Sequence, residues 1–220
     1  MEQTTNSQFD FNAIIEKARF VLTDPKGCWG KIKAEQTDIK GVYVPYVVVL
    51  SAIPVVCGFI GMMVFGILGF RPSFIGQLVS SILQYGLGFV GIFIGAHIFK
   101  FLAPKFGGND DLLSAIKLLA YAYTASWVGG ALGIFPPLLI LGLLFALYSL
   151  YTLYQGITPM LGVPESSRIP FFAVSIIVGI VLTFLIAMIV GIVTPKPPTL
   201  SAETQQQLEL FQQQMQNLGK

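Results

Sequence analysis

Charged residues are scarce in this chain of 220 residues. They make up 11% of the sequence, whereas hydrophobic residues make up 54%. A soluble domain contains about 25% charged residues. Because this chain has too little polar surface to cover a core in water, we predict that it folds in a membrane. The net charge of +2 gives no indication of a nucleic-acid partner, and we expect none.

The sequence motifs of enzymes and metal sites are also missing. There is no His-Glu-x-x-His, no Gly-x-Ser-x-Gly and no P-loop. The single histidine, His97, does not build a multi-histidine metal site. The pair Asp110-Asp111 has the chemistry to bind a divalent ion, but its position favours the start of a helix. We therefore expect no catalytic residue, no metal and no cofactor.

Long uncharged runs, in contrast, are abundant. The longest extends from Leu118 to Pro164 and contains no Asp, Glu, Lys, Arg or His. One membrane crossing needs about 20 apolar residues, and prolines at Pro136-Pro137 interrupt the run, so it predicts a hairpin of two spans. The complete prediction is an all-α transmembrane bundle of five helices. Their ranges are near residues 42–68, 74–102, 118–134, 136–157 and 169–193.

Polar segments flank this predicted five-span domain of residues 41–194. Residues 1–40 carry an apolar stripe at helical spacing and predict an amphipathic segment, for which Asp10 is a plausible N-cap. Four residues near the ends of spans have the chemistry of the membrane interface. They are Trp29, Ile32, Lys33 and Lys117. A partner-binding helix and a surface linker stay open as alternatives for the N-terminal segment. The Gln-rich tail, residues 195–220, is expected to be an interfacial helix or a frayed end.

The distribution of basic residues predicts the orientation of the chain. An odd number of crossings places the two ends on opposite sides of the membrane. Most of the 13 Lys and Arg residues then fall on the side of the N-terminal segment. Because such residues mark the cytoplasmic side, we expect a multi-pass protein of the cell's inner membrane, with a cytoplasmic N-terminus and an extracytoplasmic C-terminus.

The polar side chains inside the predicted spans are clustered on helical faces. The candidates for a binding role are Tyr148, Tyr151, Gln155, Tyr123, Ser126, Trp127 and Gln84. Two interpretations stay open: these groups bond one helix to another, or they line a cavity for a lipid headgroup or a small molecule. All 11 acidic residues lie outside the predicted spans, which argues against a proton-coupled transporter.

Three stretches together resemble a known family. The first is Asp24-Pro25 followed by Trp29-Gly-Lys-Ile-Lys-Ala-Glu35. The second is Gly107-Gly108 followed by Ala115-Ile-Lys117-Leu-Leu-Ala-Tyr121-Ala-Tyr123-Thr124. The third is Phe135-Pro136 followed by Tyr148-Ser-Leu-Tyr151 and Gly156, and then by Val163-Pro164-Glu165. In order and spacing they resemble bacterial members of the Yip family, named for interaction with Ypt/Rab GTPases, over most of residues 20–194.

The resemblance implies five spans, a cytoplasmic N-terminus and a short C-terminal tail on the far side. Eukaryotic members bind Rab GTPases, but their Asp-Leu-Tyr-Gly-Pro motif is absent here, so we do not expect a Rab-type partner. The preferred hypothesis is a non-enzymatic integral membrane protein that associates with lipid, with other membrane proteins or with itself. The alternative is a permease, channel or lipid-handling protein with a cavity lined by tyrosine and glutamine.

Overall fold

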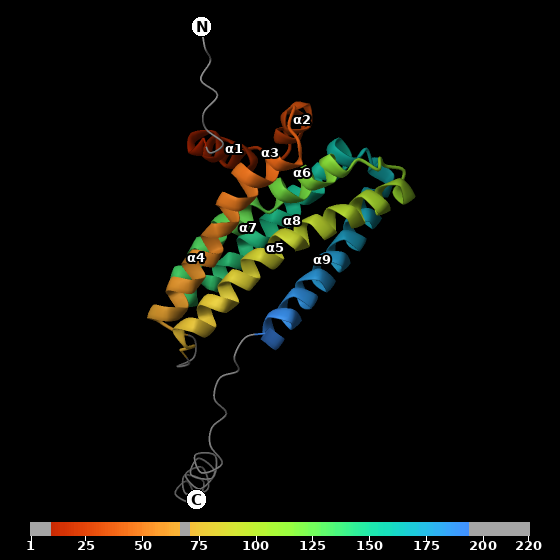
Figure 1. Cartoon of the computed structure of the whole chain (residues 1–220). Helices are drawn as coiled ribbons and strands as arrows, with labels where there is room; N and C mark the ends of the chain where they lie inside the picture. Colours follow the sequence, from red (N-terminus) through yellow and green to blue (C-terminus); the bar gives the residue numbers. More distant parts are fainter. Residues whose placement is uncertain (1–9, 67–70, 194–220) are drawn as a thin grey trace, which may run out of the picture.

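The computed structural model describes residues 10–66 and 71–193, which form helices joined by short connections (Figure 1). The predicted all-helical fold is confirmed. Two short helices, α1 (Phe11–Thr23) and α2 (Cys28–Ala34), lie at one end of a bundle of longer ones. The predicted glutamine-rich tail lies outside the described residues.

Within residues 10–66 and 71–193, four helical segments are long and apolar enough to cross a membrane. The first, Ile39–Val64, combines α3 (Ile39–Val42), a π-helical turn (Tyr43–Val47) and α4 (Val48–Val64). The second, Phe74–Phe106, combines α5 (Phe74–Leu102) with a 3-10 turn, η2 (Ala103–Phe106). The others are Ile140–Leu161 within α8 (Leu139–Leu161) and Glu165–Ile192 within α9 (Glu165–Val193).

The predicted third span differs from the expectation of one continuous helix. It is an interrupted segment that consists of α6 (Leu112–Ala122), α7 (Thr124–Gly129) and the 3-10 turn η3 (Gly130–Ile134). At the first break, the Thr124 hydroxyl donates to the carbonyl of Tyr121 at 2.7 Å. Such a local bond gives the backbone an alternative partner to the helical ladder. This segment packs against α4, α5 and α8.

The hairpin predicted at the paired prolines is present. Phe135 has φ −122° and ψ 98°, the extended conformation that a following proline imposes. A 3-10 turn (Pro136–Leu138) then leads into α8. Because the reversal is tight, α8 packs directly against the interrupted segment.

Glycines allow the interrupted segment to approach its neighbours closely. A Cβ atom added to Gly61 of α4 would lie 2.0 Å from the carbonyl oxygen of Gly133. A Cβ atom added to Gly129 of α7 would lie 2.4 Å from the Cβ atom of Phe145 in α8. Since neither site has room for a side chain, the backbones pack as at the small-residue contacts of membrane helices.

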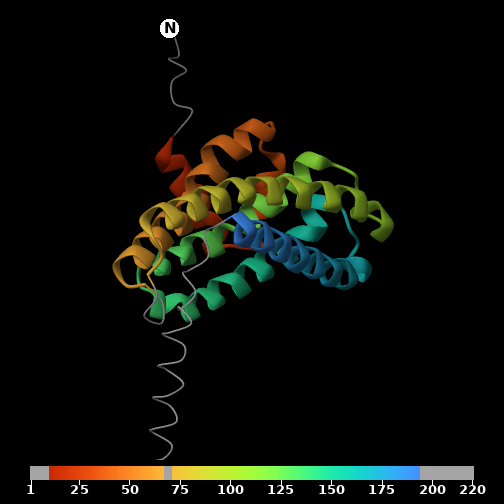
Figure 2. The same ribbon diagram turned by 60° about the horizontal axis from the view of Figure 1, so that its bottom comes forward.

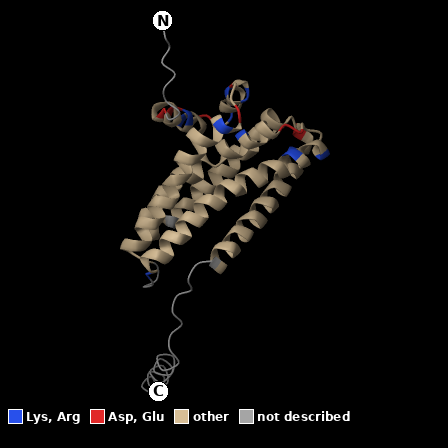
Figure 3. Ribbon diagram, viewed as in Figure 1, with Lys and Arg blue, Asp and Glu red and all other residues tan. Residues whose placement is uncertain are grey.

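Charge and chain direction give the bundle two distinct ends. Figure 3 shows most of the described charged residues gathered at the end that carries α1 and α2. Arg71, in the connection between α4 and α5, belongs to the opposite end. The last turn of α9 also lies away from α1, at the opposite end of the bundle (Figure 1).

Helix α9 lies on the periphery of the molecule, where it packs on α5, η2 and part of α8. Figure 2 shows it crossing beneath α5 on the outside of the bundle. The buried core is instead centred on α6, in which every side chain from Ser114 to Ala122 is buried. The interrupted segment is therefore the centre of the bundle, and α9 is its edge.

Candidate functional site

The N-terminal cap, defined here as residues 10–38, covers the charged end of the bundle. Asp10 accepts hydrogen bonds from amides of the first turn and is the N-cap of α1, as its position in the sequence predicted. Asp24 accepts a bond from the amide of Gly27 at 2.8 Å and shapes the turn into α2. One face of α1 is buried against the bundle. Its side chains are Ile14, Ala18 and Val21.

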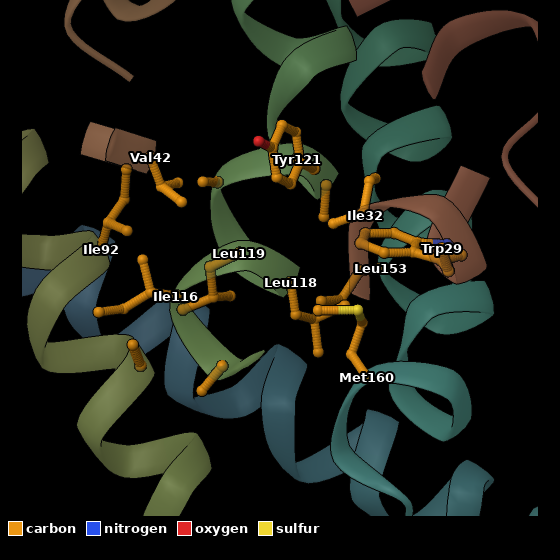
Figure 4. Close-up of a cluster of buried hydrophobic side chains, with 14 of the residues drawn as sticks. Trp29, Ile32, Val42, Ile92, Ile116, Leu118, Leu119, Tyr121, Leu153 and Met160 are labelled. Carbon is orange, nitrogen blue, oxygen red and sulfur yellow. The ribbon is translucent and has the colours of Figure 1, made fainter. Parts of the chain in front are cut away.

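Trp29 is the anchor of this cap. Its side chain is fully buried and lies among core residues that include Leu153 and Met160 (Figure 4). The indole fits against α8 because position 156 is glycine. A Cβ atom on Gly156 would lie 2.6 Å from the indole ring and 2.4 Å from the side chain of Leu118. The indole of Trp29 therefore fills the space that the absence of a side chain at Gly156 leaves on α8.

Trp29 and Ile32, which we predicted for the membrane interface, pack against other parts of the protein. Trp29 is 0% exposed and Ile32 is 3% exposed, and both belong to the protein core. The apolar face of α2 contacts protein because the end of the bundle offers a matching apolar surface. Cys28 on the same helix is also fully buried, and desolvation together with the nearby Asp24 charge raises the pKa of its thiol to about 12.

Lys117, also predicted for the membrane interface, is buried in the protein as well. We expected its ammonium group to reach the lipid headgroups, but the residue is 3% exposed. Its Nζ donates to the carbonyl oxygens of Ile32 at 3.0 Å and Glu35 at 2.7 Å. These carbonyls belong to the C-terminal end of α2, where helices leave acceptors unpaired and a positive charge is favourable. Lys117 of α6 therefore caps α2 from another part of the chain.

Three further polar contacts hold the cap. Lys17 forms an ion pair with Glu35 between α1 and the end of α2. Lys33, the remaining predicted interface residue, is exposed but donates to the carbonyl oxygen of Pro159 at 2.7 Å. The Tyr148 hydroxyl donates to the carbonyl oxygen of Leu22 near the C-terminal end of α1, also at 2.7 Å. Both α1 and α2 are thus bonded at their C-terminal ends by side chains from other elements.

A polar cleft of about 610 Å³ lies beside Lys117, between the segment that follows α2 and the start of α6. Its lining includes acidic and basic groups, most of which already have a structural partner. Asp38 caps α3, and Asp111 caps α6 through the amides of Leu113 and Ser114. The cleft is therefore a junction between the cap and the bundle.

The seven residues considered as cavity candidates belong to α5, to α7 and the residue before it, and to α8. Neither the polar cleft nor the apolar groove on α5 described below is lined by any of them. Tyr148 bonds the cap, as stated above, and Ser126 bonds the hydroxyl of Ser149 in α8 at 2.8 Å. Tyr123 and Tyr151 are each 40% exposed on the outer surface.

The remaining three candidates differ in their exposure. Gln84 is exposed on α5, and Gln155 is half-buried on α8. Trp127 is buried in α7, with its ring stacked on that of Tyr123 at a centroid distance of 6.1 Å. Ser126 and Tyr148 therefore bond one part of the chain to another, whereas Tyr123 and Tyr151 lie on the outer surface.

A buried polar contact at the break of the interrupted segment was missed by sequence reasoning. The Tyr46 hydroxyl lies 2.7 Å from the hydroxyl of Thr124, and all of Tyr46, Thr124 and Tyr121 are buried. The rings of Tyr46 and Tyr121 pack at a centroid distance of 4.5 Å. The only signal in the sequence was the presence of tyrosine and threonine inside apolar runs, which does not identify the partners.

An apolar groove of about 370 Å³ follows the last turns of α5. It is lined by Phe93, Ile94, His97, Ile98 and Phe101. His97 donates through Nδ1 to the carbonyl oxygen of Phe93 at 2.9 Å, because a carbonyl oxygen only accepts. No group of three or more His, Cys, Asp or Glu residues with the arrangement of a metal site occurs in residues 10–66 and 71–193.

Comparison with known proteins identifies one matching family. The model of the Yip1 domain matches residues 19–188, which extend from the last turns of α1 to near the end of α9. No curated protein and no solved structure matches the chain.

Proposed function

Because the chain belongs to the Yip1 domain family, we propose that it is a non-enzymatic, multi-pass membrane protein of the Yip type that acts by association with lipid or with other membrane proteins. The proposal is supported above all by the two-sided structure of the cap. Its inner face is fully used in contacts with the bundle, whereas its outer face presents exposed charged and apolar side chains.

The outer face of α1 carries the residues best placed for such association. Phe11 is 59% exposed and Ile15 is 63% exposed, one turn apart on the same face. Arg19 is exposed a further turn along the helix. Apolar and basic residues at the edge of a membrane bundle are the chemistry of a helix that contacts headgroups or a partner helix. The protein partner in this proposal is a second copy of this chain or another membrane protein.

A photo-crosslinking experiment in native membranes tests this proposal. Benzoylphenylalanine replaces Phe11 or Ile15 on the outer face, and Ile14 on the inner face is the matched control. We expect the outer positions to form adducts with lipid or with another protein chain, and the inner position to link only to the bundle. If Phe11 and Ile15 also gave only links within the chain, the proposal would be overturned.

We further propose that the cap is cytoplasmic and that the end of α9 is extracytoplasmic, in the inner membrane. The excess of basic residues at the capped end supports this orientation. The test uses single cysteines at two exposed positions, Lys26→Cys and Arg71→Cys, in a chain without Cys28 and Cys57. A membrane-impermeant reagent should label the second in intact cells and the first only after permeabilisation. The reverse pattern would contradict the orientation.

A further inference from the structure

The groove on α5 combines an apolar floor with positive charge at one end. All five lining residues come from the C-terminal part of one helix, and that part of α5 leads to the charged end of the bundle. Phe101 is 66% exposed, and the Nζ atom of Lys105 lies 4.3 Å from the centre of its ring. The ammonium group therefore stands over the end of the groove that is closest to the headgroup region.

Two lysines at this end have no carboxylate partner. The ion pairs in the part of the chain that the structure describes are Lys17–Glu35 and Arg168–Glu165. Lys100, in the last turn of α5, and Lys105 take part in neither. An ammonium group on a flexible stem is a common partner of phosphate. The groove is thus apolar along its length, and the positive charges of the two lysines at one end are not neutralised by a carboxylate.

We propose that this groove binds an anionic phospholipid of the leaflet on the side of the cap. One acyl chain lies along Phe93, Ile94 and Ile98, and the phosphate lies near Lys105 and Lys100. The anionic class follows from charge: an anionic phospholipid brings a net negative charge to the two lysines, whereas in phosphatidylcholine the positive choline cancels the charge of the phosphate. The site specifies which lipid class the protein would bind and where, and it depends on the association with lipid proposed above.

His97 has a defined place in this site. Its Nδ1 is occupied by the carbonyl of Phe93, and its ring packs on the Phe93 ring at a centroid distance of 4.3 Å. The imidazole is therefore held in the floor of the groove, and Nε2 is the nitrogen left for a ligand. His97 lies about one helical turn before Lys100 on α5, so in the proposed complex its Nε2 would face the part of the lipid just below the phosphate.

The test uses the full chain in nanodiscs and a phospholipid with a diazirine in one acyl chain. Phosphatidylglycerol is compared with phosphatidylcholine that carries the same chain, and adducts are mapped by mass spectrometry. We expect phosphatidylglycerol to label residues 93–101 more than phosphatidylcholine does. Lys105→Gln should reduce this labelling about fivefold, the factor expected for one lysine near an anionic surface, and Lys100→Gln should reduce it further.

Lys31→Gln is the matched control. Lys31 also lies over an aromatic ring, that of Phe20 at 4.6 Å, but it belongs to α2 and not to the helix that lines the groove. This variant should leave labelling of residues 93–101 unchanged. Equal labelling by the two lipids, or labelling of α5 no greater than that of α9, would overturn the site. Absence of adducts on every helix would instead overturn the proposed association with lipid, so the two failures are distinguishable.

Discussion

Helix α9 and the interrupted segment, α6–α7–η3, traverse the same bundle but are held in opposite ways. Helix α9 is unbroken and has the highest mean hydropathy of the four long segments. Among its described side chains, only Phe171 and Ser175 are buried. The interrupted segment breaks twice, contains a lysine, and has the most completely buried helix of the described chain in α6.

The difference teaches what hydropathy measures in a membrane protein. A lipid chain is as apolar as leucine, so a very apolar helix loses nothing by remaining at the edge of the bundle. Helices associate through close packing at small residues and through polar contacts. The interrupted segment has both: close packing at Gly129 and Gly133, and polar contacts at Lys117 and Thr124. In α9, by contrast, the hydroxyls of Ser175 and Thr183 bond carbonyl oxygens of their own helix.

The strongest test of this comparison makes the same substitution at a glycine of α4 that contacts the interrupted segment and at a glycine of α9. Gly61→Ala forces a methyl group against the backbone oxygen of Gly133, so we expect it to lower the free energy of unfolding by about 3 kcal/mol, the upper range for overpacking. Gly191→Ala in α9 meets no atom within 4 Å, and its effect should stay within about 0.5 kcal/mol. Unfolding in mixed micelles followed by circular dichroism measures both.

One result with these two glycine variants would contradict the comparison. Equal stability of the Gly61 and Gly191 variants would mean that η3 is free to move away from α4. The burial of the interrupted segment would then not depend on close backbone contact.

The next effect concerns the polar contact made by Lys117. Lys117→Met leaves the carbonyls of Ile32 and Glu35 without their donor, so we expect a loss of about 2 kcal/mol, expressed as a loosened cap. Alkylation of Cys28 with a maleimide measures the loosening, because the thiol is buried and its pKa is raised to about 12 in the docked cap. Labelling should be faster in the variant than in the parent chain.

Thr183→Val is the control for this prediction. It also removes a polar side chain, but the Thr183 hydroxyl bonds only the carbonyl of Gly179 within α9. Cys28 should react at the parent rate in this variant. Faster labelling there, or an unchanged rate in the Lys117 variant, would show that Lys117 does not hold the cap.

The smallest expected change in the free energy of unfolding concerns the polar contact at the first break of the interrupted segment. Tyr46→Phe removes the hydroxyl that contacts Thr124 and should cost about 0.6 kcal/mol, the average for a hydrogen bond between membrane helices. Tyr151→Phe is the matched change at an exposed tyrosine for which the described residues offer no hydrogen bond. The same unfolding titration measures both, and an equal loss in the two variants would count against a role for the buried contact.

Several elements could be predicted because their signals are local. The bounds of α5 coincide with the predicted second span, and Asp10 caps α1 as expected. The hairpin at Pro136-Pro137 follows from the geometry of proline itself. In each case the residues that decide the structure are neighbours along the chain.

The candidate site could not be predicted to the same depth. The pattern of α2 indicated an amphipathic helix with Trp29 and Ile32 on its apolar face, and this face exists. An apolar face meets either lipid or protein, and the sequence does not distinguish the two. The space that receives Trp29 is at Gly156, far along the chain. The glycine in α8 does not by itself indicate which side chain packs against it.

The amino-acid sequence by itself determined that this protein is a helical membrane protein, where its long helices lie and which end of the bundle carries the charge. Composition and spacing are sufficient for this, because the apolar solvent acts on each helix separately. Only the tertiary structure decided that α6 lies at the centre, that Trp29 is an internal anchor and that Lys117 caps α2. These contacts join distant segments, and their free energy depends on fit and on paired backbone groups, which hydropathy does not record.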